Sequence, residues 1–263
     1  MDEIYDFMIN RFTNRDLYSW MVTHLGQLHS SFFKLAMKLA KRAEVCYRFE
    51  LGLKDTDTNF IKSDYWDGLR KGLLAGERLL LDLRTMEASY LEKNKRELEI
   101  TRAVSLSLID SGALFQLQTE GSCDFALPEV LFDMDFPGQK FRRIRGVSVE
   151  LHCNASSGMG VHAKLSMTSN RIRTESIDKS NESHYLPNRI GVTTIASSQA
   201  EAYAGVFNFD FRDERYLPFE GAGVDSSWRL ELPKDFRQFD YETISDVILH
   251  ISYTARNGGV SGS

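Results

Sequence analysis

Hydrophobic residues follow two different periods along this chain, and the change occurs near residue 104. Between residues 13 and 46, apolar side chains recur every three or four positions, which is typical of one face of an α-helix. Thr13, with Asp16 three residues later, makes an approximate capping box, so we predict an amphipathic helix of about 35 residues. The members of its apolar stripe are Leu17, Met21, Leu25, Leu28, Phe32, Leu35, Leu39, Ala43 and Cys46.

A second helix is predicted from Asp64 to about Val104, with Ser63 as its N-cap. No proline interrupts this stretch, so about 40 residues at about 1.5 Å each would make a rod of roughly 60 Å. Three glycines share one stripe at spacings of four; they are Gly68, Gly72 and Gly76. We interpret them as a helix-packing groove for a neighbouring backbone, and the alternative is that tertiary packing simply tolerates them.

The polar segment 51–62 is short enough to turn the chain back, so the two helices are expected to run antiparallel. Two helices this long and this apolar cannot cover their faces against each other alone. We therefore expect further helices, from another part of a larger protein or from copies of this chain.

After residue 104, apolar and polar residues alternate, which is typical of β-strands with one buried face. The clearest strands are predicted at 147–153, 161–167, 207–211, 228–232 and 247–253. Weaker strands are expected at 113–118, 123–127 and 190–196, with a helical turn from Pro128 to Phe132 and a polar connection at 170–189. The predicted fold class is α+β: a long antiparallel helical pair at 1–104, followed by an antiparallel β-sandwich at 105–263.

The composition and charge of the chain argue against several classes of function. The 263 residues carry a net charge of −5, and the imbalance lies in the second half, because residues 1–104 have 17 basic and 16 acidic side chains. An acidic second half argues against nucleic-acid binding, which needs a basic surface. Neither a signal peptide nor an apolar run of membrane-spanning length is visible. The three cysteines, Cys46, Cys123 and Cys153, have no CxxC spacing and suggest neither a disulfide framework nor a zinc site.

No group of residues makes a convincing catalytic, cofactor or metal site. Three histidines, His152, His162 and His250, fall on polar faces of predicted strands and could surround a metal only if those strands were neighbours. Strand histidines that face water are common, so this interpretation is the weaker one. The carboxylate pair Asp133 and Asp135 would need a cleft to act as a glycosidase pair. We therefore predict a protein without enzymatic activity.

Three long stretches resemble one protein family. WDGLRKGLLAGERLLLDLRTMEASYLEKNKRELEITRAVSL (66–106) closely resembles the C-terminal region of the A component of bacterial Tc insecticidal toxin complexes. LPEVLFDMDFPG (127–138) and the basic strand FRRIRGVSVEL after it are similar to the same region. The most specific match is FDFRDERYLPFEGAGVDSSWRLELP (209–233), with FRQFDYETISDVILHISYTARNGG (236–259) behind it.

The resemblance implies a docking domain of a secreted toxin. In that family the A component is a pentamer with a central channel, and its C-terminal region receives the B and C components. The β-propeller of the B component forms the gate through which the toxic enzyme enters the channel. The helices of this chain would then belong to the channel bundle and promote self-association, and the sandwich would form the funnel rim.

The segment 212–223 is our candidate for the docking rim, because it has two charges of each sign within four positions and its proline and glycines shape a tight loop. The candidate partner-docking residues are Arg212, Asp213, Glu214, Arg215, Tyr216 and Glu220. The alternative function is a carbohydrate-binding sandwich that would use surface aromatics such as Tyr185, Tyr203 or Trp228.

Overall fold

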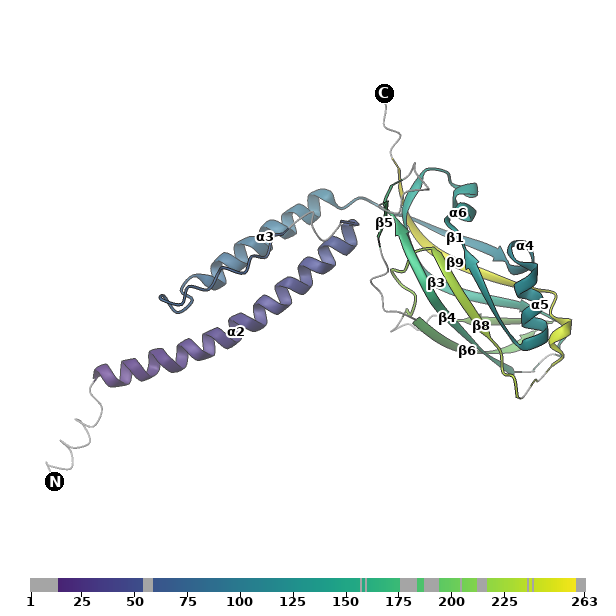
Figure 1. Cartoon of the computed structure of the whole chain (residues 1–263), viewed down its shortest axis with the longest axis horizontal. Coiled ribbons are helices and arrows are strands. Elements are labelled where there is room, and N and C mark those ends of the chain that lie inside the picture. The colour runs from purple at the N-terminus through teal and green to yellow at the C-terminus, as the bar shows by residue number, and fades with distance from the viewer. Residues whose placement is uncertain are drawn as a thin grey trace, which may run out of the picture. The chain divides into compact units, whose positions relative to one another are not determined.

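A computed structural model describes residues 14–53, 59–156, 158, 160–175, 184–186, 194–203, 205–211, 217–235, 237 and 239–258. The chain divides into two compact units, Met1–Asn94 and Lys95–Ser263, and Figure 1 labels their elements. The division lies at residue 94 and not at 104, because residues 98–105 form a strand of the second unit.

The first unit contains two helices, α2 (Asn14–Leu51) and α3 (Ala75–Lys93). The first predicted helix is confirmed by α2, and its expected capping residue Thr13 lies outside the described residues. No helix in the described part of the chain is both long enough and apolar enough to cross a membrane.

The two helices run in the same direction and not antiparallel as predicted. Phe33 in the middle of α2 shares an apolar cluster with Ala75 and Leu79 at the start of α3. Tyr47 near the end of α2 hydrogen-bonds Ser89 near the end of α3, at 2.9 Å. The helices are therefore parallel, and the segment between them makes the return (Figure 1).

Residues 59–74 run back along α2 before α3 begins. The Glu44 carboxylate of α2 accepts hydrogen bonds from the backbone N–H groups of Phe60 and Ile61. Further back along α2, the ring of Trp66 lies 5.3 Å from His29 and 5.5 Å from Phe33. This return segment explains how two parallel helices can follow each other closely in sequence.

The predicted start and the predicted end of the second helix are both wrong. It begins at Ala75 and not at Asp64, because Lys71 (φ 47°), Gly72 (φ 75°) and Leu74 (φ 65°) adopt left-handed backbone angles that a right-handed helix cannot contain. It ends at Lys93, after which the chain becomes extended at Asn94. Ser63 is therefore not an N-cap.

The predicted glycine stripe does not exist as a helix-packing groove. Gly68 and Gly72 lie in the turns before α3, and a Cβ atom added to Gly72 would collide with the ring of Trp66. Gly76 alone is helical, and a Cβ atom added there would meet no atom within 4 Å. Gly72 is thus needed for a tight turn beside an indole ring and not for the approach of another helix.

The second unit is an antiparallel sandwich, and it confirms the predicted α+β class. Its strands in the described residues are β1 (Leu98–Ser105), β2 (Ser122–Leu127), β3 (Gln139–His152), β4 (Gly160–Arg173), β5 (Tyr185–Leu186), β6 (Thr194–Tyr203), β7 (Val206–Asp210), β8 (Asp225–Glu231) and β9 (Asp246–Asn257). They follow the order β1-β9-β3-β7-β6-β4-β8-β2, with β5 beside β4. Because β6 pairs with both β4 and β7, one continuous path folds into two layers.

The core between the layers is formed by the inward residues of the predicted alternating strands. Phe207 and Phe209 of β7 are fully buried, as are the neighbouring apolar residues of β3, β4, β8 and β9. Phe209 pairs across the sheet with Val149 of β3, so both side chains point to the same face. The strand register predicted for 207–211 is confirmed by this burial.

Two short helices, α4 (Leu106–Ile109) and α5 (Ser111–Glu120), lie at one end of the sandwich, with the 3-10 turn η2 (Tyr241–Thr243) packed against α5. The strand predicted at 113–118 is wrong, since these residues belong to α5. The helix begins at the Asp110 side chain, which accepts a hydrogen bond from Ala113 N–H, and ends at Gly121 with φ 72°. At the other end of the sheets lies α6 (Glu129–Asp135), where a helical turn was predicted (Figure 1).

The connection predicted at 170–189 is shorter than expected. β4 continues to Arg173, and β5 pairs with it at Tyr185 and Leu186. The remaining residues of that connection, from 176 to 183 and from 187 onward, lie outside the described part of the chain.

Candidate functional site

The seven-residue helix α6 closes the end of the sandwich where β3 begins and β4 ends. Pro128 caps its start in an extended conformation, and Phe132 reaches from its inner side into the core. The Phe132 ring is fully buried and meets Tyr253 of β9 edge-on at 5.3 Å. One aromatic side chain therefore anchors α6 in the core, and charged side chains hold the rest of the helix.

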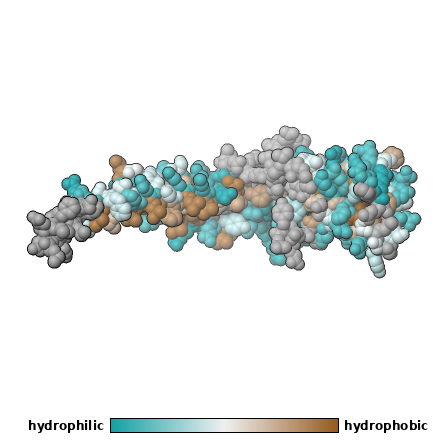
Figure 2. All heavy atoms as spheres, turned by 90° about the horizontal axis from the view of Figure 1, so that it is seen from below, coloured by the Kyte–Doolittle hydropathy of each residue, from teal (hydrophilic) through white to brown (hydrophobic). Residues whose placement is uncertain are grey.

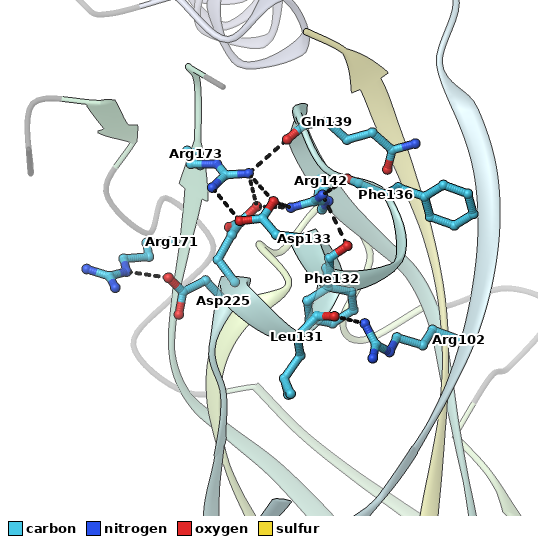
Figure 3. A network of polar contacts seen from close by, with 11 residues as sticks. Arg102, Leu131, Phe132, Asp133, Phe136, Gln139, Arg142, Arg171, Arg173 and Asp225 are labelled. Carbon is cyan, nitrogen blue, oxygen red and sulfur yellow. Dashed lines mark hydrogen bonds and ion pairs between the residues drawn. The ribbon is translucent and has the colours of Figure 1, made fainter. Parts of the chain in front are cut away.

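Two buried arginines, one from each layer, hold two carboxylates of α6 (Figure 3). Arg142 of β3 donates to Glu129 at 2.6 Å and to Asp133 at 2.9 Å. Arg173 of β4 donates two hydrogen bonds to Asp133, at 2.6 and 2.9 Å. Both arginines are 1% exposed, so these pairs are almost completely removed from water. The α6 carboxylates thus tie the two layers together.

Backbone carbonyl groups complete this network. Arg142 also donates to the carbonyl oxygen of Phe136, just after α6, at 2.9 Å. Arg173 donates to the carbonyl oxygen of Gln139 at 2.9 Å. A planar guanidinium has five N–H donors in fixed directions, so each arginine fixes the position of several groups at once.

The pKa values of the two carboxylates are shifted in opposite directions, although burial acts in the same direction on both. Burial raises the pKa of Glu129, and the nearby charges of Arg173 and Arg142 reduce this effect without cancelling it. Burial also acts to raise the pKa of Asp133, but the hydrogen bonds and charges of Arg173 and Arg142 outweigh it and lower that pKa to about 2. Asp133 is therefore the firmly ionised member of the network.

Ion pairs also border α6 on two sides. Arg102 of β1 donates to the carbonyl oxygen of Leu131 and pairs with Asp135 at 2.8 Å. On the β4 side, Arg171 pairs with Asp225 at 2.7 Å, and its guanidinium lies 4.4 Å from the Tyr185 ring centre. These pairs are partly exposed and form a polar border beside the helix.

The segment 217–224 is pinned to the same part of β3. Ile144 exchanges backbone hydrogen bonds with Gly221 and Ala222, at 2.8 and 2.7 Å. Gly223 donates its N–H to the Asn170 side chain at 3.0 Å, and a Cβ atom there would collide with the backbone of β4. Only glycine fits between the two strands at this position.

Of the predicted docking residues, Glu220 lies in this pinned segment and pairs with Arg145 at 2.9 Å. Both side chains are about half exposed. The other candidates, Arg212, Asp213, Glu214, Arg215 and Tyr216, lie outside the described residues.

A further arginine pair fixes the start of β1. Glu97 binds Arg143 at 3.0 Å and Arg256 at 2.8 Å. Both guanidinium groups lie over the Phe141 ring, 4.8 and 4.1 Å from its centre. Burial acts to raise the pKa of Glu97, but a hydrogen bond from Thr254 and the two arginines lower it overall.

The weaker chemical interpretations of the sequence gain no support from the described residues. His152 and His250 lie on neighbouring strands beside Glu150, with Nε2 to carboxylate distances of 3.7 and 3.3 Å, while His162 is on β4 in the other layer. No group of three His, Cys, Asp or Glu side chains in the described part of the chain is placed to hold a metal ion.

The three aromatic residues considered for a carbohydrate platform do not form one surface. Trp228 is 1% exposed and donates its indole N–H to Ser226. Tyr185 is half-buried beside Arg171, and Tyr203 is exposed on a different strand. A stacking platform built from these three residues is therefore absent.

The helical unit has a second surface of functional interest. One side of α2 packs on α3, and most of its remaining apolar side chains face water; Figure 2 shows apolar residues along this unit. The exposed large hydrophobic residues of α2 are Leu17, Tyr18, Trp20, Met21, Val22, Leu25, Leu28, Phe32, Leu35, Leu39 and Val45. They include most of the predicted stripe, so α3 does not cover the face that the sequence marks as buried.

Residues 1–255 match the family described as the Tc toxin complex TcA C-terminal TcB-binding domain. A curated relative, toxin subunit YenA2 of Yersinia entomophaga, is 34% identical over 268 residues, which cover 96% of this chain and 19% of the relative. The chain belongs to the TcB-binding domain family of Tc toxin A components.

Solved structures contain the same fold. This chain resembles part of the cryo-EM structure of Yersinia pseudotuberculosis TcaA-TcaB, with a TM-score of 0.68, 25% identity and coverage of 97% of this chain and 15% of that chain. It also resembles part of Morganella morganii TcdA4, with a TM-score of 0.65, 28% identity and coverage of 97% and 12%. The chain thus spans less than a fifth of the length of each of these relatives.

Proposed function

We propose that this chain is the part of a secreted Tc toxin on which the B component docks, and that it acts by binding and not by catalysis. The match of residues 1–255 to a TcB-binding domain carries the proposal. In its finer form, the β-propeller of the B component rests on the sandwich. Together they make the funnel through which the toxic enzyme enters the channel.

The docking rim includes segment 212–223, with Arg212, Asp213, Glu214, Arg215, Tyr216 and Glu220 as contact residues. Support comes from its described part, residues 217–223, in which Gly221 and Ala222 exchange backbone hydrogen bonds with Ile144. Arg145 additionally holds the Glu220 side chain. The described part of the rim is held in this way, so it loses little conformational entropy when a partner binds.

The experiment is co-elution of the purified chain with the purified B component of the same toxin complex on a sizing column. We expect one peak that contains both proteins. Both proteins are loaded at about 10 μM, which is about ten times a Kd of 1 μM, or a binding free energy of about −8.2 kcal/mol. Separate elution of the two folded proteins would therefore contradict the proposed docking role.

We further propose that the exposed face of α2 binds copies of the same chain, which form a pentamer in the full-length A component. Leu28 and Phe32 are more than half exposed on this face, and an apolar stripe of this length is typical of a helix bundle. Light scattering should give a mass above that of the monomer for the wild type, and Phe32→Glu should lower it. Lys38→Glu, also exposed on α2, should leave the mass unchanged.

A further inference from the structure

Three exposed apolar residues lie within seven positions, two on the outward side of α6 and one just after the end of the helix. They are Val130 (48% exposed), Met134 (74%) and Phe136 (45%), and we name them the α6 patch. Val130 and Met134 are four residues apart and so lie on one face of the helix. In the described part of the sandwich, no other helix or strand exposes as many large apolar side chains, since Leu108 of α4 and Phe115 of α5 are on separate helices.

The way α6 is held suggests that its exact position matters. Burying ion pairs is expensive, and well-packed apolar residues often stabilise a core as well or better. The Arg142 and Arg173 pairs with Glu129 and Asp133 nevertheless fix this short helix to both layers. What such pairs provide is a defined orientation, and a rigid apolar patch loses little entropy when a partner covers it.

The surroundings of the α6 patch match the anatomy of a protein–protein contact. An apolar centre is bordered by the partly exposed pairs Arg102–Asp135 and Arg171–Asp225. Interfaces commonly have such an apolar centre with a polar rim. Because these charges already have partners within the chain, the fitting surface is an apolar recess edged by neutral hydrogen-bonding groups and not an oppositely charged patch.

The same strand, β3, holds both α6 and the described part of the proposed docking rim. Arg142 of β3 holds α6, and the next residues of the same strand, Ile144 and Arg145, hold residues 220–222. One short stretch of β3 therefore contacts both α6 and residues 220–222, and it fixes their positions relative to each other.

We propose that the α6 patch is the apolar anchor of the contact with the B component. This inference rests on the proposed function and assigns that function to one surface of the sandwich. A second copy of the chain is the less suitable occupant, because α2 offers a separate and longer apolar face for self-association.

The test compares binding of the full chain to immobilised B component by biolayer interferometry. Met134→Glu places a charge in the centre of the patch, and its melting temperature should not change because the side chain is exposed. We expect its Kd to rise at least tenfold, which is about 1.4 kcal/mol. Met134→Leu keeps the apolar contact and should bind like the wild type. The matched control is Leu108→Glu on α4, which should change the Kd less than about twofold.

Three results would overturn the inference. Met134→Glu could bind as tightly as the wild type. Leu108→Glu could abolish binding instead, which would place the contact at the α4–α5 end. Met134→Glu could lower the mass of the free chain in light scattering, which would make the α6 patch a contact between copies. Absence of binding by the wild-type chain would contradict the proposed function itself, and it is recognised before any variant is measured.

Discussion

Arg142→Ala tests whether the buried network holds the sandwich together. The substitution removes donors to Glu129, Asp133 and the Phe136 carbonyl, and it leaves Glu129 6% exposed with Arg173 as its remaining cation at 3.5 Å. Removing one partner of a buried ion pair typically costs about 3–5 kcal/mol. In a unit of this size each kcal/mol corresponds to about 2–4 °C, so the melting temperature should fall by about 6–20 °C.

The matched control is Arg145→Ala, three residues further along the same strand. Its pair with Glu220 is about half exposed, and exposed pairs contribute about 0.2–1 kcal/mol. Differential scanning calorimetry of the full chain measures both variants.

An equal fall in melting temperature for Arg142→Ala and Arg145→Ala would refute this reasoning. A further variant separates unpaired charge from lost packing. The double change Glu129→Met and Arg142→Met removes both charges and keeps the volume, so it should recover most of the lost stability. Failure to recover it would mean that the shape of the arginine matters more than its charge.

Further predictions concern the core, the return segment and acid stability. Phe209→Ala should cost about 3–5 kcal/mol in urea unfolding, because it empties a fully buried position, and a cost below about 1 kcal/mol would contradict the packing. Gly72→Ala should destabilise the helical unit through its left-handed φ and the Trp66 ring, whereas Gly76→Ala should stabilise it by up to about 1 kcal/mol, and equal signs would contradict the described turn. The Asp133 charge stabilises the fold fully above its ordinary pKa of 3.8 and loses this effect as the pH falls towards 2, so the stability difference between wild type and Asp133→Asn should shrink over that range. A difference that stays constant with pH would contradict the ionised network.

Local patterns predicted the elements whose faces are decided within a few residues. The spacing in α2 and the alternation around Phe207 and Phe209 each mark a buried side directly. The same pattern does not predict which element covers a buried face, since most of the α2 stripe is not covered by α3. The parallel course of the two helices follows from the left-handed turn at residues 71–74, which a helical reading of that stretch conceals.

Two elements of the second unit differ in type from the prediction, β1 because of a distant contact and α5 in spite of its local signals. β1 was assigned to a helix because no proline or turn interrupts its residues, yet all eight pair with β9, more than a hundred positions away. α5 was assigned to a strand, although Asp110 before it and Gly121 after it are ordinary helix signals that could have identified it.

The α6 network lies between these cases. Glu129 and Asp133 are four residues apart, so the sequence predicts two carboxylates on one face of a helix. The sequence-based interpretation of Asp133 considers it only together with Asp135, as a possible glycosidase pair. Arg142 was visible in the basic stretch that follows. The second arginine, Arg173, reaches the site only through the pairing of β4 with β8 and β6, which no local pattern specifies.

The most direct test of the docking account is a cryo-EM map of this chain in complex with the purified B component. The account predicts density for the B component against the end of the sandwich that carries α6 and residues 217–224. A map in which the B component contacts only the helical unit, or only the α4–α5 end of the sandwich, would contradict it.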